Sequence, residues 1–227
     1  SLALGVGLAA MDAATSYSLE RIQFERKISE FQAIQWKIAD RYTDLEAARL
    51  LLMNGAYLKE QGRSFAKQAS MAKLFASEAA NRACYDAMQI LGGYGYTSDY
   101  PIERYTRDAR ITTIYEGTSE IMEWTISRDR WRDNLQQRGQ YYLKVVPSVE
   151  ALHAQAPDVG AGITALAMRA LHVLMEHARL NRLTRNQHVL FRLGELISWA
   201  ECAASLARRA ARAADDALAQ KADRRFG

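Results

Sequence analysis

The chain has 227 residues, of which 49% are hydrophobic and 25% are charged, and its formal net charge is +4 at pH 7. This length accommodates one large domain or two small ones with a sizeable core, and the mild positive charge does not require a nucleic-acid partner. With only three prolines and a composition rich in alanine, leucine, arginine and glutamate, the sequence favours helices over a β-domain.

The two cysteines, Cys84 and Cys202, are far apart in the sequence. They match no metal-binding or redox spacing, which predicts two buried thiols in a reducing compartment and no metal site. No apolar run of about 18 residues predicts a transmembrane helix, and no basic-then-apolar signal peptide is present. We therefore expect a soluble, intracellular protein of the cytoplasm.

Apolar residues at helical spacing predict long amphipathic helices in the first part of the chain. The first helix is already under way at residue 2, so we expect the chain to be a piece of a longer protein. Residues 97–116 are expected to form an irregular or one-turn helical connection. The long helices are predicted at residues 2–24, 29–60, 65–91 and 118 to about 144.

A break is predicted between Pro147 and Gly162, because prolines and glycines cluster there. Two further helices are expected over residues 161–184 and 187–222. The predicted fold is therefore all-α. An up-and-down four-helix bundle over residues 1–145 is followed by a helical extension over residues 146–227.

Glu116 is a candidate catalytic residue, because it ends the apolar run of residues 111–115 and stands directly before Gly117. A carboxylate held among apolar and aromatic groups is poorly hydrated and becomes a stronger proton acceptor. Thr118 or Ser119 can cap the helix that follows, and free N–H groups at a helix start can bind an oxyanion. An ordinary helix N-terminus with an acidic neighbour explains the same residues.

Two other segments carry weaker signals. In residues 20–24 an arginine and an amide at a helix end precede Phe24, a combination that can hold a phosphate and a planar ring. In residues 89–93 two glycines follow a helix; they allow close approach of a ligand and equally terminate the helix. Because no strand precedes these glycines, they are not a dinucleotide-binding fingerprint.

These segments occur in a fixed order together with Phe31-Gln32, Arg107-Asp108-Ala109-Arg110 and Ile114-Tyr115-Glu116-Gly117-Thr118-Ser119. As a set, they resemble the C-terminal helical domain of acyl-CoA dehydrogenases over about residues 2–128. The resemblance implies an FAD-dependent oxidoreductase of lipid metabolism that converts an acyl-CoA to a trans-2-enoyl-CoA. It also implies a homodimer or homotetramer, with electron-transfer flavoprotein as electron acceptor.

The resemblance further implies roles for individual residues. Glu116 would be the base that removes the α-proton, its amide N–H would help bind the thioester oxygen, and Gly117 would line the substrate. Some of the implied FAD-binding residues would contact the FAD of a neighbouring subunit. The implied FAD-binding residues are Arg21, Gln23, Phe24, Gln32, Gln89, Gly92, Gly93, Thr118 and Glu120.

The sequence departs from the family pattern at Glu25, where the family usually has glycine. Contact with a membrane surface is one role that stays open for the helical extension over residues 146–227. Its arginines Arg179, Arg182 and Arg185 allow a basic stripe, although nearby glutamates disfavour nucleic acid. Two other functions stay open: a flavoprotein relative acting in stress response or nucleic-acid binding, and a flavin-free helical interaction module.

Overall fold

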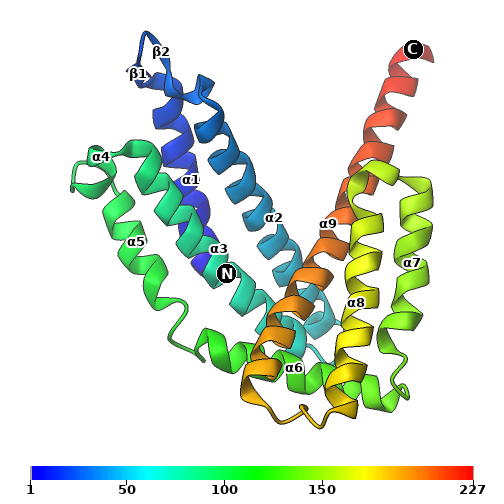
Figure 1. The fold of residues 1–227 in the computed structure, drawn as a ribbon. Coiled ribbons are helices and arrows are strands. Elements are labelled where there is room, and N and C mark those ends of the chain that lie inside the picture. The colour runs from blue at the N-terminus through cyan, green and yellow to red at the C-terminus, as the bar shows by residue number, and fades with distance from the viewer. Residues whose placement is uncertain (1, 227) are drawn as a thin grey trace. The chain divides into compact units, whose positions relative to one another are not determined.

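A computed structural model describes residues 2–226 and confirms the predicted all-α fold (Figure 1). The chain separates into two compact units, Ser1–Met122 and Glu123–Gly227. The predicted division after residue 145 falls inside a helix of the second unit, so the units differ from the predicted domains. Each unit is described by itself below.

The first unit is a bundle built on α1 (Leu2–Glu20), α2 (Gln32–Glu60) and α3 (Ala66–Leu91), as Figure 1 shows. These helices correspond to the first three predicted ones. α3 packs against both α1 and α2, and it is lined with small residues such as Ala79 and Ala83 that are fully buried. Small side chains allow helices to approach closely, which makes α3 the central element of this unit.

α1 has the length and hydropathy of a membrane-crossing helix, although the sequence predicted none. In the structure its apolar face packs against α2 and α3, with Ala10, Met11 and Ala14 completely buried. A helix in the core of a bundle passes the same compositional test. The packing of α1 thus accounts for its apolar character.

α1 ends at Glu20, four residues earlier than predicted, and an antiparallel hairpin follows it. β1 (Ile22–Gln23) pairs with β2 (Arg26–Lys27), and the short helix η1 (Ile28–Glu30) leads into α2. Phe24 and Glu25 form the two-residue turn with φ values of 51° and 65°. Two positive φ angles define a type I′ turn, which matches strand twist and favours glycine at the position of Glu25.

The predicted irregular connection over residues 97–116 is wrong for its central part. After the short α4 (Gly93–Tyr96), residues Ile102–Ile111 form a ten-residue helix, α5. Ile102 and Ala109 are fully buried along one face of α5. Burial of this face stabilises a helix whose sequence is otherwise dominated by charged residues.

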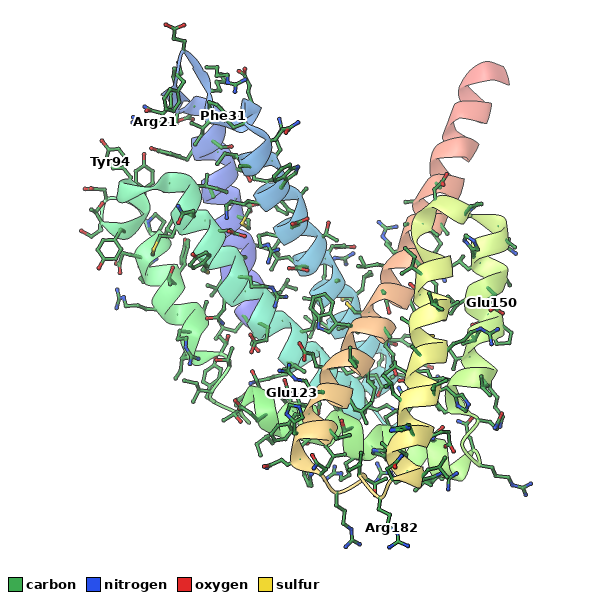
Figure 2. All side chains as sticks on the ribbon, in the orientation of Figure 1. Arg21, Phe31, Tyr94, Glu123, Glu150 and Arg182 are labelled. Carbon is green, nitrogen blue, oxygen red and sulfur yellow. The ribbon has the colours of Figure 1, made fainter. Side chains whose placement is uncertain are left out.

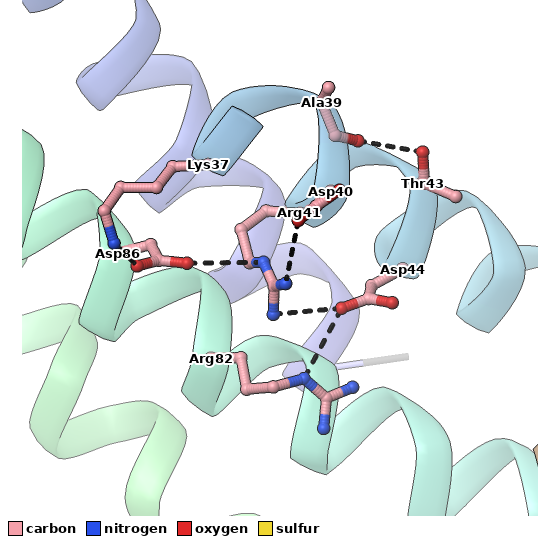
Figure 3. A network of polar contacts seen from close by, with 8 residues as sticks. All are labelled: Lys37, Ala39, Asp40, Arg41, Thr43, Asp44, Arg82 and Asp86. Carbon is pink, nitrogen blue, oxygen red and sulfur yellow. Dashed lines mark hydrogen bonds and ion pairs between the residues drawn. The ribbon is translucent and has the colours of Figure 1, made fainter. Parts of the chain in front are cut away.

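Charged residues of α2 form a network with charged residues of α3 (Figure 3). The Arg41 guanidinium lies 3.0 Å from Asp44 and 3.4 Å from Asp86. Asp44 also pairs with Arg82 at 3.4 Å, and Asp86 pairs with Lys37. Several charges joined in one network contribute more to stability than isolated exposed pairs.

The second unit contains most of α6 (Ser119–Gln136), then α7 (Tyr141–Gln155), η2 (Pro157–Val159), α8 (Ala161–Leu180) and α9 (Gln187–Phe226). The predicted helix to residue 144 ends at Gln136, because the chain reverses through Arg138 and Gly139 with positive φ. Pro147 lies inside α7 and does not mark a break. α7 continues through it because Val146 and Val149 are buried.

Arg130 on α6 is completely buried and forms the polar centre of the second unit. Its guanidinium pairs with Glu201 and lies 3.0 Å from Asp133. It also stacks 3.8 Å from the centroid of the Tyr141 ring. Burial disfavours the charged form of Arg130, whereas the negative charge of Glu201 favours it. Because the nearby negative groups outweigh burial, the pKa of Arg130 is raised. Arg130 thus stays charged inside the unit.

We expect replacement of Arg130 by methionine to lower the free energy of unfolding by about 3–5 kcal/mol, because Glu201 would keep a partly buried charge without its partner. Urea denaturation measures this loss. Arg132→Met is the matched control, since Arg132 is exposed on the same helix and exposed pairs contribute about 1 kcal/mol or less. Equal losses in both variants would contradict a special role for Arg130.

Cys84 is buried on α3, and its thiol donates to the Tyr105 carbonyl at 3.5 Å. Burial, followed by the charge of Asp108, raises the pKa of the Cys84 thiol to about 12. At pH 8 the thiolate fraction is then about a thousandfold below that of an ordinary cysteine. In a Cys202→Ala background we expect Cys84 to react with a disulfide reagent only as the protein unfolds. Rapid labelling of the native protein would contradict this prediction.

Candidate functional site

The corner that carries Glu116 lies between α5 and α6. Glu116 and Gly117 have φ values of 54° and 95°, so two consecutive residues adopt left-handed backbone conformations. The Ser119 N–H donates to the Thr113 carbonyl at 3.1 Å and closes the loop. A left-handed conformation costs a residue with a side chain about 1–2 kcal/mol, and such strain is concentrated at functional sites.

α3 holds this corner through two side chains. Lys73 Nζ donates to the Gly117 carbonyl at 2.5 Å, and Ser119 Oγ donates to Glu78 Oε1 at 2.6 Å. Partial burial lowers the pKa of Lys73, against the opposing charges of Glu78 and Glu116. No sequence motif identified Lys73, although a lysine within the apolar run of α3 was a visible signal.

Thr118 is the N-cap of α6, one of the two residues predicted for this position. Its hydroxyl accepts the Ile121 N–H at 3.4 Å. A hydrogen bond from Thr118, with the backbone N–H at this helix start, lowers the pKa of Glu120. The start of α6 thus favours negative charge, as its position in the helix dipole predicts.

An apolar cavity of about 340 Å³ lies on one side of the corner. Its walls come from the start of α1, the second half of α2, the first half of α3 and the loop before Glu116. Glu116 and Lys73 are among the polar groups that border it. The Glu116 side chain is otherwise exposed, so this chain alone does not enclose it among apolar groups as the sequence predicted.

A second cavity of about 530 Å³ is more polar and lies between α3, α5 and the start of α6. Thr118 and Glu120, two of the predicted FAD-binding residues, line it together with Arg110 and Asn81. The Asn81 amide donates to the Ala109 carbonyl at 2.9 Å, which ties α3 to α5 below the cavity. The structure thus places Thr118 and Glu120 in one site.

A third cavity, of about 540 Å³, brings together four other predicted FAD-binding residues: Arg21, Gln23, Gly92 and Gly93. Figure 2 labels Arg21 near the hairpin and Tyr94 at α4, both at the same end of the first unit. Gly92 has a φ of 61°, and a Cβ on Gly92 or Gly93 would meet open space. An arginine beside an open glycine backbone is suited to bind a phosphate group.

The remaining predicted cofactor residues lie outside this cavity. Phe24, Gln32 and Gln89 are exposed, and Phe24 is 87% exposed at the hairpin tip. Glu25 does not line the cavity either, so the residue that departs from the family pattern is not part of its wall.

Sequence reasoning missed the other polar and aromatic groups at the third cavity. Tyr17, Tyr94 and Tyr100 form an aromatic cluster with ring centroids 5.6–6.5 Å apart. Tyr17, Tyr94 and Asp99 line the cavity. These residues lie on separate segments, so no local motif joins them.

The predicted cofactor residues therefore fall into two separate groups. The cavity at Thr118 is bordered by Glu78, and the cavity at Arg21 is bordered by Leu91. Both residues are on α3, and the rise of the helix separates them by about 20 Å. One group lies beside Glu116 and the other at the hairpin end.

Residues 1–130 match the family model for the acyl-CoA dehydrogenase C-terminal domain. The chain therefore belongs to the acyl-CoA dehydrogenase family, through the C-terminal domain that this model describes. The bundle and the Glu116 corner lie within the matched region.

Individual relatives agree with this assignment. The chain is 52% identical over 126 residues to an acyl-CoA dehydrogenase of Bacillus subtilis, covering 56% of this chain and 33% of the relative. It is 50% identical over 127 residues to the caffeyl-CoA reductase-Etf complex subunit CarC of Acetobacterium woodii, covering 56% of this chain and 34% of that relative. The chain thus spans about a third of the length of these relatives.

A solved structure extends the likeness beyond the matched domain. An acyl-CoA dehydrogenase complexed with FAD from Bacillus anthracis matches with a TM-score of 0.71, covering 91% of this chain and 40% of that chain. The sequence identity is 22%, so this likeness concerns the fold.

The Lys73→Met variant tests whether α3 holds the corner. A hydrogen bond from a charged group contributes about 1.5–3 kcal/mol, so exchange of the hydrogen-bonded amides of the corner, those of Ile114, Tyr115 and Ser119, should accelerate roughly 10- to 100-fold. Hydrogen–deuterium exchange with peptide resolution measures the rate. Lys67→Met, on the same helix but away from the Glu116 cavity, is the control. Unchanged exchange in the Lys73 variant would show that the loop at Glu116 keeps its conformation without the hydrogen bond from Lys73.

Proposed function

We propose that the chain is the C-terminal part of an FAD-dependent acyl-CoA dehydrogenase in which Glu116 removes the α-proton of an acyl-CoA thioester. The supporting observation is the position of Glu116, which borders an apolar cavity at a strained corner within the family-matched region. An apolar cavity beside a carboxylate suits an acyl chain whose α-carbon must meet a base.

Glu116 is suited to the role of base by its backbone as well as its side chain. The left-handed corner directs it away from the regular hydrogen bonding of α5 and α6, and Lys73 holds the following residue. Among the described residues, no partner is present for the Glu116 N–H. This amide can therefore donate to the thioester oxygen as negative charge develops there.

The α-proton of a thioester is too weakly acidic for a carboxylate acting alone. General-base catalysis contributes about 10²–10⁴-fold, so stabilisation of the enolate-like oxygen and removal of water must supply more. Glu116 is exposed in this chain, and water removal would come from the rest of the protein together with bound substrate. We therefore assign the full active site to the complete enzyme.

The residues at the two other cavities fit an FAD. Arg21 and the open backbone at Gly92 and Gly93 suit the pyrophosphate, and Thr118 and Glu120 offer polar atoms to a flavin. FAD, when bound, accepts the hydrogen that leaves the β-carbon. We retain Gln23, Phe24, Gln32 and Gln89 as further cofactor contacts within the proposal.

The separation of the two cofactor groups by about 20 Å along α3 supports a cofactor shared between subunits, and hence a homodimer or homotetramer. The name of one relative includes an Etf complex, which supports electron-transfer flavoprotein as the redox partner. That relative is a reductase, and the same residues serve the reverse reaction with Glu116 returning the proton. Acyl-CoA is the proposed substrate in either direction.

We expect the full-length protein to be yellow and to lose its flavin absorbance when acyl-CoA is added without oxygen. The Glu116→Gln variant keeps the size and backbone geometry but removes the base, so bleaching should slow by about 10²–10⁴-fold. Stopped-flow absorbance over a series of acyl-CoAs measures the rate and identifies the preferred chain. Glu103→Gln, on α5 outside the three cavities, is the control.

Bleaching that survives in Glu116→Gln at the wild-type rate would overturn the assignment of the base. A colourless full-length protein would support the flavin-free interaction module instead. If the protein is yellow, no acyl-CoA in the series bleaches its flavin, and it binds DNA in a salt-dependent way, the nucleic-acid alternative would be supported.

A further inference from the structure

We propose that a cavity in the second unit, between α6, α8 and the start of α9, binds a small aromatic anion of mononucleotide size. This inference goes beyond the proposed dehydrogenation, because all the residues that carry it lie in Glu123–Gly227. It is independent of the Glu116 corner and of the cavities in the first unit.

The cavity has a volume of about 440 Å³, within the range of small-molecule sites. Two tryptophans of α6, Trp124 and Trp131, form its aromatic wall, with Leu135 and Leu190 beside them. Tryptophan offers a large flat surface on which a planar ring can stack. These residues define the part of the site that would hold the ring.

Three arginines supply the charge. Arg128, Arg179 and Arg185 line the cavity, and the described residues of its wall include no carboxylate. Arginine binds phosphate and carboxylate groups through paired N–H donors, and it also stacks on aromatic rings. The Arg128 guanidinium lies 4.7 Å from the centroid of the Trp124 ring, so charge and aromatic surface meet at one point.

Carboxylates outside the wall hold two of these arginines in place. Arg128 pairs with Asp129 at 3.0 Å, and Arg179 pairs with Glu176 at 2.8 Å. Both arginine side chains are about half exposed, and exposed ion pairs are weak enough to rearrange around a ligand. Arg185 has no ion-pair partner among the described side chains, which leaves a full positive charge available.

Trp131 provides an independent observation. Its side chain is 7% exposed, and its indole N–H has no hydrogen-bond partner among the described residues. A buried donor without an acceptor is unfavourable and is uncommon in native proteins. A ligand that brings a polar atom to the Trp131 wall would relieve this defect.

The fold, and not the sequence spacing, selects these residues. Arg179, Arg182 and Arg185 recur at intervals of three, yet only the first and third line the cavity. Arg182 has a positive φ of 57°, and Figure 2 shows it pointing away from the helices of the second unit. A flat ring between tryptophans with an anionic group at the arginines is the chemistry that this arrangement recognises.

The test uses the full-length protein as isolated, with AMP as the probe and adenosine and inorganic phosphate as its two halves. Titration calorimetry at constant ionic strength measures affinity. We expect AMP to bind at least tenfold more tightly than either half, because ring and anion contact different walls. Arg185→Met should weaken AMP binding tenfold or more. Arg182→Met removes the same charge from the same loop outside the cavity, and should weaken it less than threefold.

Tryptophan fluorescence locates the bound ring. AMP should change the emission of the wild-type protein; this change should be reduced in Trp124→Phe, because Trp131 also lines the cavity, but retained in full in Trp36→Phe. Several results would overturn the proposal: no saturable binding up to about 10 mM AMP, equal weakening by the Arg182 and Arg185 variants, or loss of binding in Arg21→Met. The last result would assign the nucleotide to the first unit, and none of them bears on the role of Glu116.

Discussion

The hydrogen bond from Lys73 to the Gly117 carbonyl is the contact on which the candidate active site depends. Two successive left-handed residues reverse the chain at Glu116, and this conformation is unfavourable without external support. α3 supplies that support through a lysine whose pKa is lowered by burial. Lys73 also lines the apolar cavity, and α6 begins at Ser119, two residues after Gly117. Strain at the corner and stability of the bundle are thus coupled.

α3 can serve this role because it packs closely with its neighbours. A Cβ on Gly7 of α1 would lie 2.7 Å from Leu45 and 3.1 Å from the Ala80 backbone, so the three helices meet with no spare volume. A close-packed interior has low compressibility, so positions far apart along α3 keep fixed relative places. The cavities along α3 are therefore parts of one rigid scaffold, each with its own chemistry.

The second unit follows a different principle, because its centre is ionic as well as apolar. Arg130 is enclosed by α6, α7 and α9 through Glu201, Asp133 and the ring of Tyr141. Close backbone contact also joins α9 to α6, where a Cβ on Gly194 would clash with the Glu123 backbone. The fold of this unit is shared with a solved relative at 22% identity. Such a fold can persist while the residues lining its surface cavities change.

The sequence by itself determined the all-α fold, the three long helices of the first unit, a helix start at Thr118 or Ser119, and the family. These features follow from local periodicity and short motifs. Only the tertiary structure decided the hairpin at Phe24, the helix α5 and the continuation of α7 through Pro147. It also decided that Lys73 supports the corner. The physical reason is that burial and contacts between distant segments outweigh local propensity in each of these cases.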